Sequence, residues 1–305
     1  MSESLAECLP ERSEGPAPSV GGVCESMARV LEPTLGSSAR DEARDLLALL
    51  HDRPRHWPVV ARNDPMTAVD AGAAVEAAHR RAAGMPLEYA AGRANFRHLT
   101  LQVDGRVLIP RPETEVLVDL VLELTRHEAG GTAVDVGTGS GAIAIALATE
   151  GRFARVIATD LSLDALALAT GNAARYTHES ATILELRHGS LLGPVTERGL
   201  RAVVSNPPYI AFAEAAALPP AVRDWEPPVA LFSAHDGMAA TARLVLDAAE
   251  RLAPRGVLAL EVDARRAAAV AALAVAHGAY ADVRVVQDLT GRERFVVARR
   301  REEQG

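Results

Sequence analysis

Four consecutive residues combine an amide, two rings without an N–H group and an aromatic face: Asn206, Pro207, Pro208 and Tyr209. They follow the apolar run 202–205, which predicts a buried strand. The prolines must end that strand, because neither can donate a ladder hydrogen bond. The Asn206 side-chain oxygen and the nearby backbone carbonyls then suit the two N–H groups of a planar amide or amino nitrogen. The alternative is a proline-rich loop that only closes a strand.

A glycine-rich turn lies upstream, between a strand expected at 132–136 and a helix expected at 141–149. Its residues are Gly137, Thr138, Gly139, Ser140 and Gly141. Glycines let the backbone approach a ligand closely, and a helix N-terminus offers unpaired N–H groups to an anionic group. The spacing also fits the dinucleotide pattern, so the turn alone leaves NAD and S-adenosylmethionine both open.

The next expected strand, 155–159, ends in Asp160, which is 23 residues after Gly137. A carboxylate at this place can bind the hydroxyl groups of a ribose. Together the glycine turn and this acid indicate an adenosine-containing cofactor. The alternative is a tight strand–helix turn in which Asp160 caps the following helix.

Helices and strands alternate from residue 113 onward, which predicts an α/β fold with a doubly wound, mainly parallel sheet. The expected helices are 113–126, 141–149, 163–175, 236–253 and 264–277, and the expected strands are 132–136, 155–159, 182–187, 201–205, 256–262, 281–287 and 293–299. The last two strands predict a closing antiparallel hairpin. We assign 113–305 to this domain, 84–112 to a hairpin linker, 25–83 to a small helical domain and 1–24 to a disordered tail.

Composition limits the possible functions. All 32 basic residues are arginine, so Schiff-base chemistry on a lysine is excluded. The two cysteines, Cys8 and Cys24, cannot build a disulfide framework or a zinc cluster, and we expect no metal. The net charge of −8 argues against nucleic acid as a partner. We expect a cytoplasmic protein with no membrane partner, since no signal peptide or membrane-spanning run is evident. We also expect a monomer.

Several motifs in a fixed order resemble one family. Gly84-Met85-Pro86-Leu87-Glu88-Tyr89, the segment 107–115 (Val-Leu-Ile-Pro-Arg-Pro-Glu-Thr-Glu), the Asn-Pro-Pro-Tyr turn and Asp288-Leu289-Thr290-Gly291-Arg292-Glu293-Arg294 are similar to motifs of the HemK-type protein-(glutamine-N5) methyltransferases. The resemblance covers about residues 84–299. It implies a class I S-adenosylmethionine-dependent methyltransferase fold, and methylation of the glutamine in the Gly-Gly-Gln motif of peptide-chain release factors.

The resemblance also implies roles for individual residues. The implied catalytic residues are Asn206, Pro207 and Tyr209, and these three with Pro208 would bind the substrate glutamine. Residues 137–141 would contact the methionine end of the cofactor, Asp160 the ribose and Leu191 the adenine, and Asn206 would also bind the cofactor. The helical domain would hold the protein substrate, with a packing appendage as the alternative.

Four positions differ from the family pattern: Arg201, Ser190, Glu88 and Asp263. Two other functions stay open, namely a methyltransferase for another protein glutamine or a nucleic-acid amino group, and a non-catalytic S-adenosylmethionine-binding module. The intact Asn-Pro-Pro-Tyr turn argues against the module, and the acidic composition argues against nucleic acid. Residues 224–227 (Asp-Trp-Glu-Pro) are expected on the substrate side of the site, with a surface turn as the alternative.

Overall fold

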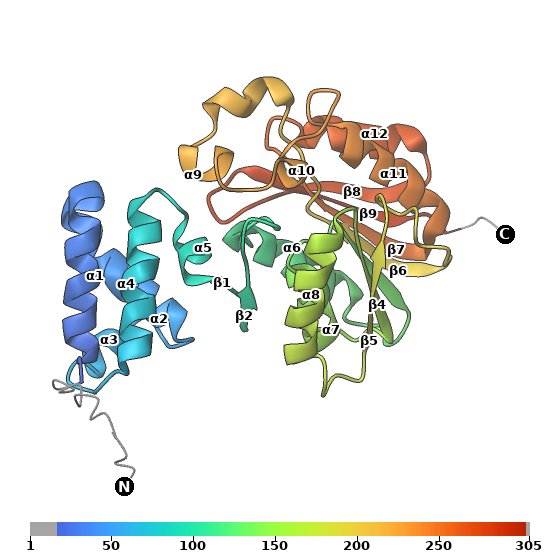
Figure 1. Cartoon of the computed structure of the whole chain (residues 1–305). Helices are drawn as coiled ribbons and strands as arrows, with labels where there is room; N and C mark the ends of the chain where they lie inside the picture. Colours follow the sequence, from blue (N-terminus) through green and yellow to red (C-terminus); the bar gives the residue numbers. More distant parts are fainter. Residues whose placement is uncertain (1–16, 303–305) are drawn as a thin grey trace, which may run out of the picture. The chain divides into compact units, whose positions relative to one another are not determined.

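The computed structural model describes residues 17–302 of the chain. It consists of two compact units, one ending at Ala83 and the other beginning at Gly84. Figure 1 labels most of the helices and strands of both units. Each unit has its own buried core, so each is described separately below.

The N-terminal unit is entirely helical within the described residues. Its elements are α1 (Val20–Leu35), the 3-10 helix η1 (Gly36–Ser38), α2 (Ala39–Leu50), α3 (Trp57–Val60) and α4 (Ala68–Ala82). Helix α1 packs against α2 and α4. Met27 and Leu31 of α1 and Leu46 and Leu47 of α2 are completely buried. These are the apolar stripes that amphipathic helices bury against each other.

The prediction of a disordered tail over 1–24 is wrong for its last residues, because α1 begins at Val20. Ser19 caps this helix by accepting a hydrogen bond from the Gly22 N–H group at 3.1 Å. A Cβ atom on Gly21 would lie 2.5 Å from Cγ of Arg62, so this glycine serves close packing. Val20 and Val23 are buried in the bundle. Residues 1–16 lie outside the described residues.

The second unit confirms the predicted doubly wound sheet, whose strand order is β5-β4-β3-β6-β7-β9-β8. The strands from β5 to β7 are parallel, and β9 pairs antiparallel with both β7 and β8. The strands are β3 (Thr132–Val136), β4 (Arg155–Asp160), β5 (Ile183–His188), β6 (Leu200–Ser205), β7 (Leu252–Glu261), β8 (Tyr280–Gln287) and β9 (Glu293–Arg300). The helices between them are α6 (Pro112–Thr125), α7 (Ala142–Glu150), α8 (Leu163–Tyr176), α11 (Ala239–Arg251) and α12 (Ala267–His277).

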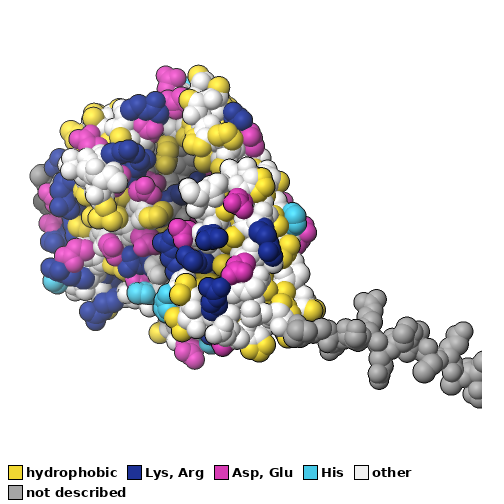
Figure 2. All heavy atoms as spheres, turned by 90° about the vertical axis from the view of Figure 1, so that its left-hand side faces the viewer, with side chains coloured by type: hydrophobic (Ala, Val, Ile, Leu, Met, Phe, Trp, Pro, Cys, Tyr) yellow, Lys and Arg dark blue, Asp and Glu magenta, His cyan; other side chains and the backbone are white. Residues whose placement is uncertain are grey.

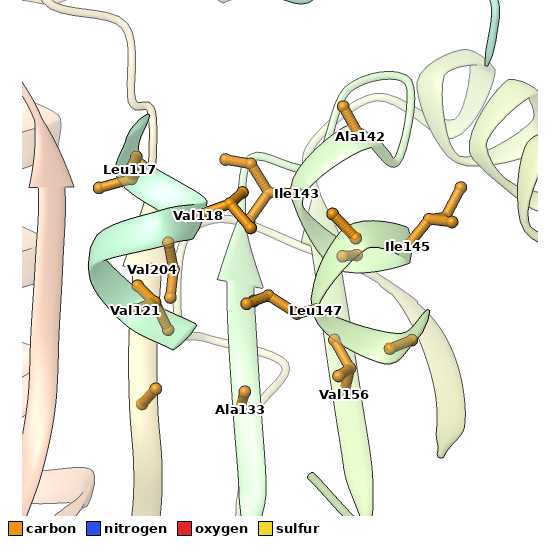
Figure 3. Packing of buried hydrophobic residues seen from close by; sticks show 14 of the residues in the cluster. Leu117, Val118, Val121, Ala133, Ala142, Ile143, Ile145, Leu147, Val156 and Val204 are labelled. Carbon is orange, nitrogen blue, oxygen red and sulfur yellow. The ribbon is translucent and has the colours of Figure 1, made fainter. Parts of the chain in front are cut away.

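Both faces of this sheet are covered, since successive strand residues point to opposite faces. On one face, apolar side chains of α6 and α7 meet Ala133, Val156 and Val204 of the strands (Figure 3). On the other face, α11 and α12 pack against residues such as Val134 and Val203. Strands that are buried on both faces consist of consecutive apolar residues, so the sequence alone predicted where they lie.

The linker predicted at 84–112 contains a two-stranded hairpin, with α5 (Leu87–Ala91) before β1 (Arg93–Phe96) and β2 (Leu99–Gln102). Gly92 ends α5 in the left-handed conformation, with φ of 68°. The Tyr89 hydroxyl donates to the Val107 carbonyl at 2.5 Å, which ties α5 to the segment leading into α6.

Arg201, which differs from the family pattern, has a structural place at the amino end of β6. Its guanidinium donates to the carbonyls of Gly130 at 2.8 Å, Arg152, Thr125 and Glu128. It also lies over the Phe153 ring, 5.0 Å from the ring centroid. Asn206 follows the opposite end of the same strand, so Arg201 is remote from the candidate site.

On the face drawn in Figure 2, arginine and acidic side chains are interspersed. Among the described residues, no helix is both long enough and apolar enough to span a membrane.

Candidate active site

A cavity of about 540 Å³ opens at the carboxyl edge of β3, β4 and β6. This is the edge where open α/β sheets bind their ligands, and the volume is in the range of small-molecule sites. Its walls come from the turns after these strands, the segment before α6 and the chain between β6 and α11. The lining residues used below are Arg111, Thr114, Gly137, Thr138, Gly139, Ser140, Asp160, Ser190, Leu191, Asn206 and Pro208.

The glycine turn after β3 presents its backbone to this cavity. Gly137 and Gly139 have φ angles of 74° and 54°, and a Cβ atom at either position would meet nothing within 4 Å. Asp135 of β3 fixes the conformation of the turn, because its Oδ2 accepts a hydrogen bond from the Thr138 hydroxyl at 2.6 Å. Burial raises the pKa of Asp135 to about 7. The first four residues of the turn, 137–140, line the cavity. Gly141 does not line it and is instead the N-cap residue of α7.

Asp160 lines the cavity, as the sequence predicted for a residue at the end of β4. Its Oδ2 accepts from the Gly139 N–H group at 2.9 Å, and its Oδ1 accepts from the Ser162 N–H group at 2.8 Å. Ser162, whose hydroxyl accepts from the Ala165 N–H group, is the N-cap of α8. Each carboxylate oxygen of Asp160 keeps a further lone pair, so two hydroxyl groups of a ligand can still bind there.

Leu191 also lines the cavity, with Ser190 beside it. Leu191 has a φ of 49°, in the left-handed region that few non-glycine residues adopt. Its carbonyl accepts from the Thr159 hydroxyl at 2.9 Å, which holds the turn after β5 against the end of β4. The turn is therefore fixed beside Asp160.

The Asn-Pro-Pro-Tyr turn follows β6 directly. Asn206 and Pro208 line the cavity, whereas Pro207 is buried and Tyr209 is half-buried outside the lining. Desolvation raises the pKa of the Tyr209 hydroxyl, so it stays protonated. Asn206 donates from Nδ2 to the Thr114 hydroxyl oxygen at 3.1 Å, which leaves its side-chain oxygen free to accept.

Thr114 is placed by the start of α6. Pro112 occupies the first turn of this helix, where its missing N–H group costs no hydrogen bond. This brings the Thr114 hydroxyl between β6 and β7, where it donates to Glu261 Oε2 at 2.7 Å. Glu261 ends β7 and is 1% exposed, and burial raises its pKa to about 7.

The segment between β6 and α11 forms another wall. It contains η2 (Phe212–Ala217), α9 (Pro220–Arg223) and α10 (Pro228–Leu231). Glu226 is 3% exposed and accepts from the Arg111 guanidinium at 2.5 Å. Trp225 packs against the cluster of Tyr89 and Val107. Residues 224–227 are therefore anchored to the linker, beside an arginine that lines the cavity.

Sequence reasoning assigned no role to three residues of this region, Thr114, Arg111 and Glu261, and it placed Glu226 only as part of the substrate-side segment 224–227. Thr114 and Arg111 belong to the segment 107–115, which served only as a family motif. Glu226 and Glu261 are single acidic residues, and their importance depends on burial, which no local pattern reports. The sequence offers one signal for Glu261: it is an acidic residue at the end of an apolar run, which is the place of a carboxylate at a strand end.

Two family models match the chain. The model described as PrmC N-terminal domain matches residues 25–92, and the Methyltransferase small domain matches residues 113–218. Among solved structures, the hMettl16 catalytic domain is 17% identical with a TM-score of 0.56, covering 75% of this chain and 82% of that one. A methyltransferase from Pyrococcus furiosus is 18% identical with a TM-score of 0.51, covering 68% and 91%. At these identities the structures support the fold alone.

Curated relatives are much more similar in sequence. The release factor glutamine methyltransferase of Gloeobacter violaceus is 46% identical over 213 residues, which are 70% of this chain and 74% of that protein. The release factor glutamine methyltransferase of Cereibacter sphaeroides is 41% identical over 276 residues, 89% of this chain and 96% of that protein. With this similarity, and with the glycine turn and the Asn-Pro-Pro-Tyr turn at one cavity, the chain belongs to the S-adenosylmethionine-dependent release factor glutamine methyltransferases.

Proposed function

We propose that this chain transfers a methyl group from S-adenosylmethionine to the side-chain amide nitrogen of the glutamine in the Gly-Gly-Gln motif of a peptide-chain release factor. The observation that carries the proposal is the juxtaposition of Asn206 with the glycine turn and Asp160 around one cavity. An amide-binding group and a cofactor-binding loop then face the same enclosed space, as a direct transfer requires.

The cavity suits S-adenosylmethionine. The exposed backbone of Gly137 and Gly139 would contact the methionine end, the two carboxylate oxygens of Asp160 the ribose, and Leu191 the adenine. When bound, the cofactor supplies a methyl group on a positively charged sulfur, which is already a strong electrophile. The enzyme therefore has to position the nucleophile rather than form a covalent intermediate.

Asn206 and Pro207 would position the substrate amide. The Asn206 side-chain oxygen and the Pro207 carbonyl would each accept one N–H bond, which aims the nitrogen lone pair along the transfer line. The amide nitrogen would gain positive charge as it takes the methyl group, the methyl–sulfur bond would break to leave a neutral thioether, and the nitrogen would then lose one N–H proton. Fixed acceptor dipoles stabilise the charge that develops on the nitrogen. Holding two reactants in line contributes several kcal/mol in favourable cases. Tyr209, whose raised pKa keeps it neutral, would pack against the glutamine side chain.

The helical N-terminal unit would bind the body of the release factor. Contacts remote from the reacting amide can be used to lower the barrier at the amide. An intact release factor should therefore be methylated faster than a short peptide that contains Gly-Gly-Gln. Because the substrate is a translation factor, the enzyme would act in the cytoplasm.

The test is incubation of the protein with isotope-labelled S-adenosylmethionine and purified release factor, followed by mass spectrometry of the Gly-Gly-Gln peptide. One added methyl group on the glutamine is expected, with no label on duplex DNA. Label on another protein from a lysate, with none on release factor, would refute the proposed substrate. Label on DNA would favour the nucleic-acid alternative.

A further inference from the structure

Three polar groups from distant parts of the chain form one continuous hydrogen-bonded series, which runs from Asn206 and Thr114 at the cavity wall to the buried Glu261 behind it. Asn206 Nδ2 donates to Thr114 Oγ1 at 3.1 Å, and Thr114 Oγ1 donates to Glu261 Oε2 at 2.7 Å. Thr114 is 4% exposed and Glu261 is 1% exposed. We call this series the Asn206–Thr114–Glu261 relay.

The order of donors in the relay is determined by Glu261. An ionised carboxylate can only accept hydrogen bonds, so the single hydroxyl proton of Thr114 must point toward it. The oxygen of Thr114 is then left to accept, and it can accept only from the NH₂ group of Asn206. The amide of Asn206 is thereby held with its nitrogen toward Thr114 and its oxygen toward the cavity.

We propose that Thr114 and Glu261 are positioning residues, which orient the Asn206 amide so that its oxygen, not its NH₂ group, faces the substrate glutamine. This inference rests on the proposed function, in which Asn206 accepts an N–H bond from that glutamine. With the amide reversed, Asn206 would present an NH₂ group to another NH₂ group, and the substrate would lose one acceptor.

The surroundings of Glu261 make the relay sensitive to pH. Burial favours the neutral carboxyl group and raises its pKa to about 7, with Glu113 of α6 acting in the same direction. The Thr114 hydrogen bond and the charges of Arg294 on β9 and Arg111 favour the ionised form. The Tyr209 hydroxyl and Asp263 belong to the same group of interacting side chains. A protonated Glu261 can donate to Thr114, which allows the whole series to reverse.

The test compares single-turnover methylation of release factor by wild type and three variants at saturating S-adenosylmethionine. Thr114→Val keeps the shape but removes the hydroxyl, and should lower the rate at least tenfold while cofactor affinity changes less than twofold. Thr114→Ser keeps the hydroxyl and should recover most of the rate. Thr125→Val is the matched control, because Thr125 is a buried threonine of the same helix whose hydroxyl donates to the Val121 carbonyl, away from Asn206 and Glu261; its rate should equal that of wild type.

The pH profile gives a readout that a merely structural role would not change. The wild-type rate should fall as pH drops through about 7, where Glu261 becomes protonated. Glu261→Gln should be slow at pH 8 and should lose this acid limb. If Thr114→Val does not fold, the pH profile of Glu261→Gln alone tests the inference, because loss of the acid limb supports it and an unchanged acid limb refutes it.

Three outcomes with active wild type would overturn the inference: a normal rate for Thr114→Val, equal losses for Thr114→Ser and Thr114→Val, or an unchanged acid limb in Glu261→Gln. A wild-type protein that methylates no release factor would instead refute the proposed function, and this inference with it.

Discussion

Replacing Asn206 tests the centre of the proposed mechanism. Asn206→Ala removes the acceptor oxygen at the cavity and the donor to Thr114, but leaves the glycine turn and Asp160 in place. Loss of one preorganised transition-state contact typically lowers a rate by about 10²–10³-fold. We expect a loss of this size in the methyl-transfer step. Cofactor affinity should change far less, because other residues form most of that part of the cavity.

Asn206→Asp is a sharper perturbation, because the structure predicts its pH dependence. The new carboxylate would face the Thr114 hydroxyl, which has one proton and already donates it to Glu261. Two carboxylates would then compete for a single donor. At pH 8 the variant should be about as slow as Asn206→Ala. Below pH 7 a protonated Glu261 can donate to Thr114, so the variant should recover activity where the wild type loses it.

The assay is single-turnover transfer of a labelled methyl group to release factor between pH 6 and 9, with cofactor affinity measured separately by calorimetry. A wild-type rate for Asn206→Ala would show that the Asn-Pro-Pro-Tyr turn is structural, and would favour the non-catalytic binding module. An Asn206→Asp profile parallel to that of the wild type would refute the reasoning about the shared proton.

Three further predictions concern the cofactor, the fold and pH. Asp160→Ala should weaken S-adenosylmethionine binding by about 1–3 kcal/mol in calorimetry, since charge-assisted hydrogen bonds to the cofactor are lost. An unchanged affinity would show that Asp160 only holds the turn, through its bonds to the Gly139 and Ser162 N–H groups. Arg201→Met should lower the free energy of unfolding by about 2–4 kcal/mol in urea titrations, because one buried and three part-buried carbonyls lose their donor. An unchanged midpoint would contradict this. The raised pKa values of Glu261 and Asp135, from 4.5 and 3.8 to about 7, mean that the folded state binds these protons more tightly. Stability should therefore fall as pH rises from about 4 to 7, by about 1.4 kcal/mol per shifted pKa unit, and thermal melts that rise over this window would contradict it.

The sequence alone was sufficient for the elements of the sheet. Strands buried on both faces are short apolar runs, and glycine or proline marks their ends, so β3 and β6 were predicted within one residue. The same local patterns identified the glycine turn, Asp160 and the Asn-Pro-Pro-Tyr turn as candidates, and the family resemblance added Leu191. These residues follow strand ends, and parallel strand ends meet at one edge.

Local sequence patterns did not predict the secondary structure where tertiary packing outweighs local composition. The stretch 17–24 is rich in glycine and proline, yet Val20 and Val23 are buried and begin α1. The segment after β6 contains three short helices, two of them with proline at the first position. Helices of four residues have too few turns to show an apolar period, so they were not predicted.

What only the tertiary structure decided is which polar groups meet. Thr114 is 92 residues from Asn206 and 147 residues from Glu261, and Arg111 is 115 residues from Glu226. A residue's propensity and spacing depend on its neighbours along the chain, whereas burial and hydrogen-bond partners depend on the order of the strands. The sequence could therefore name the amide that would bind the substrate. The reason that this amide points its oxygen into the cavity lies in contacts that exist only after the sheet has formed.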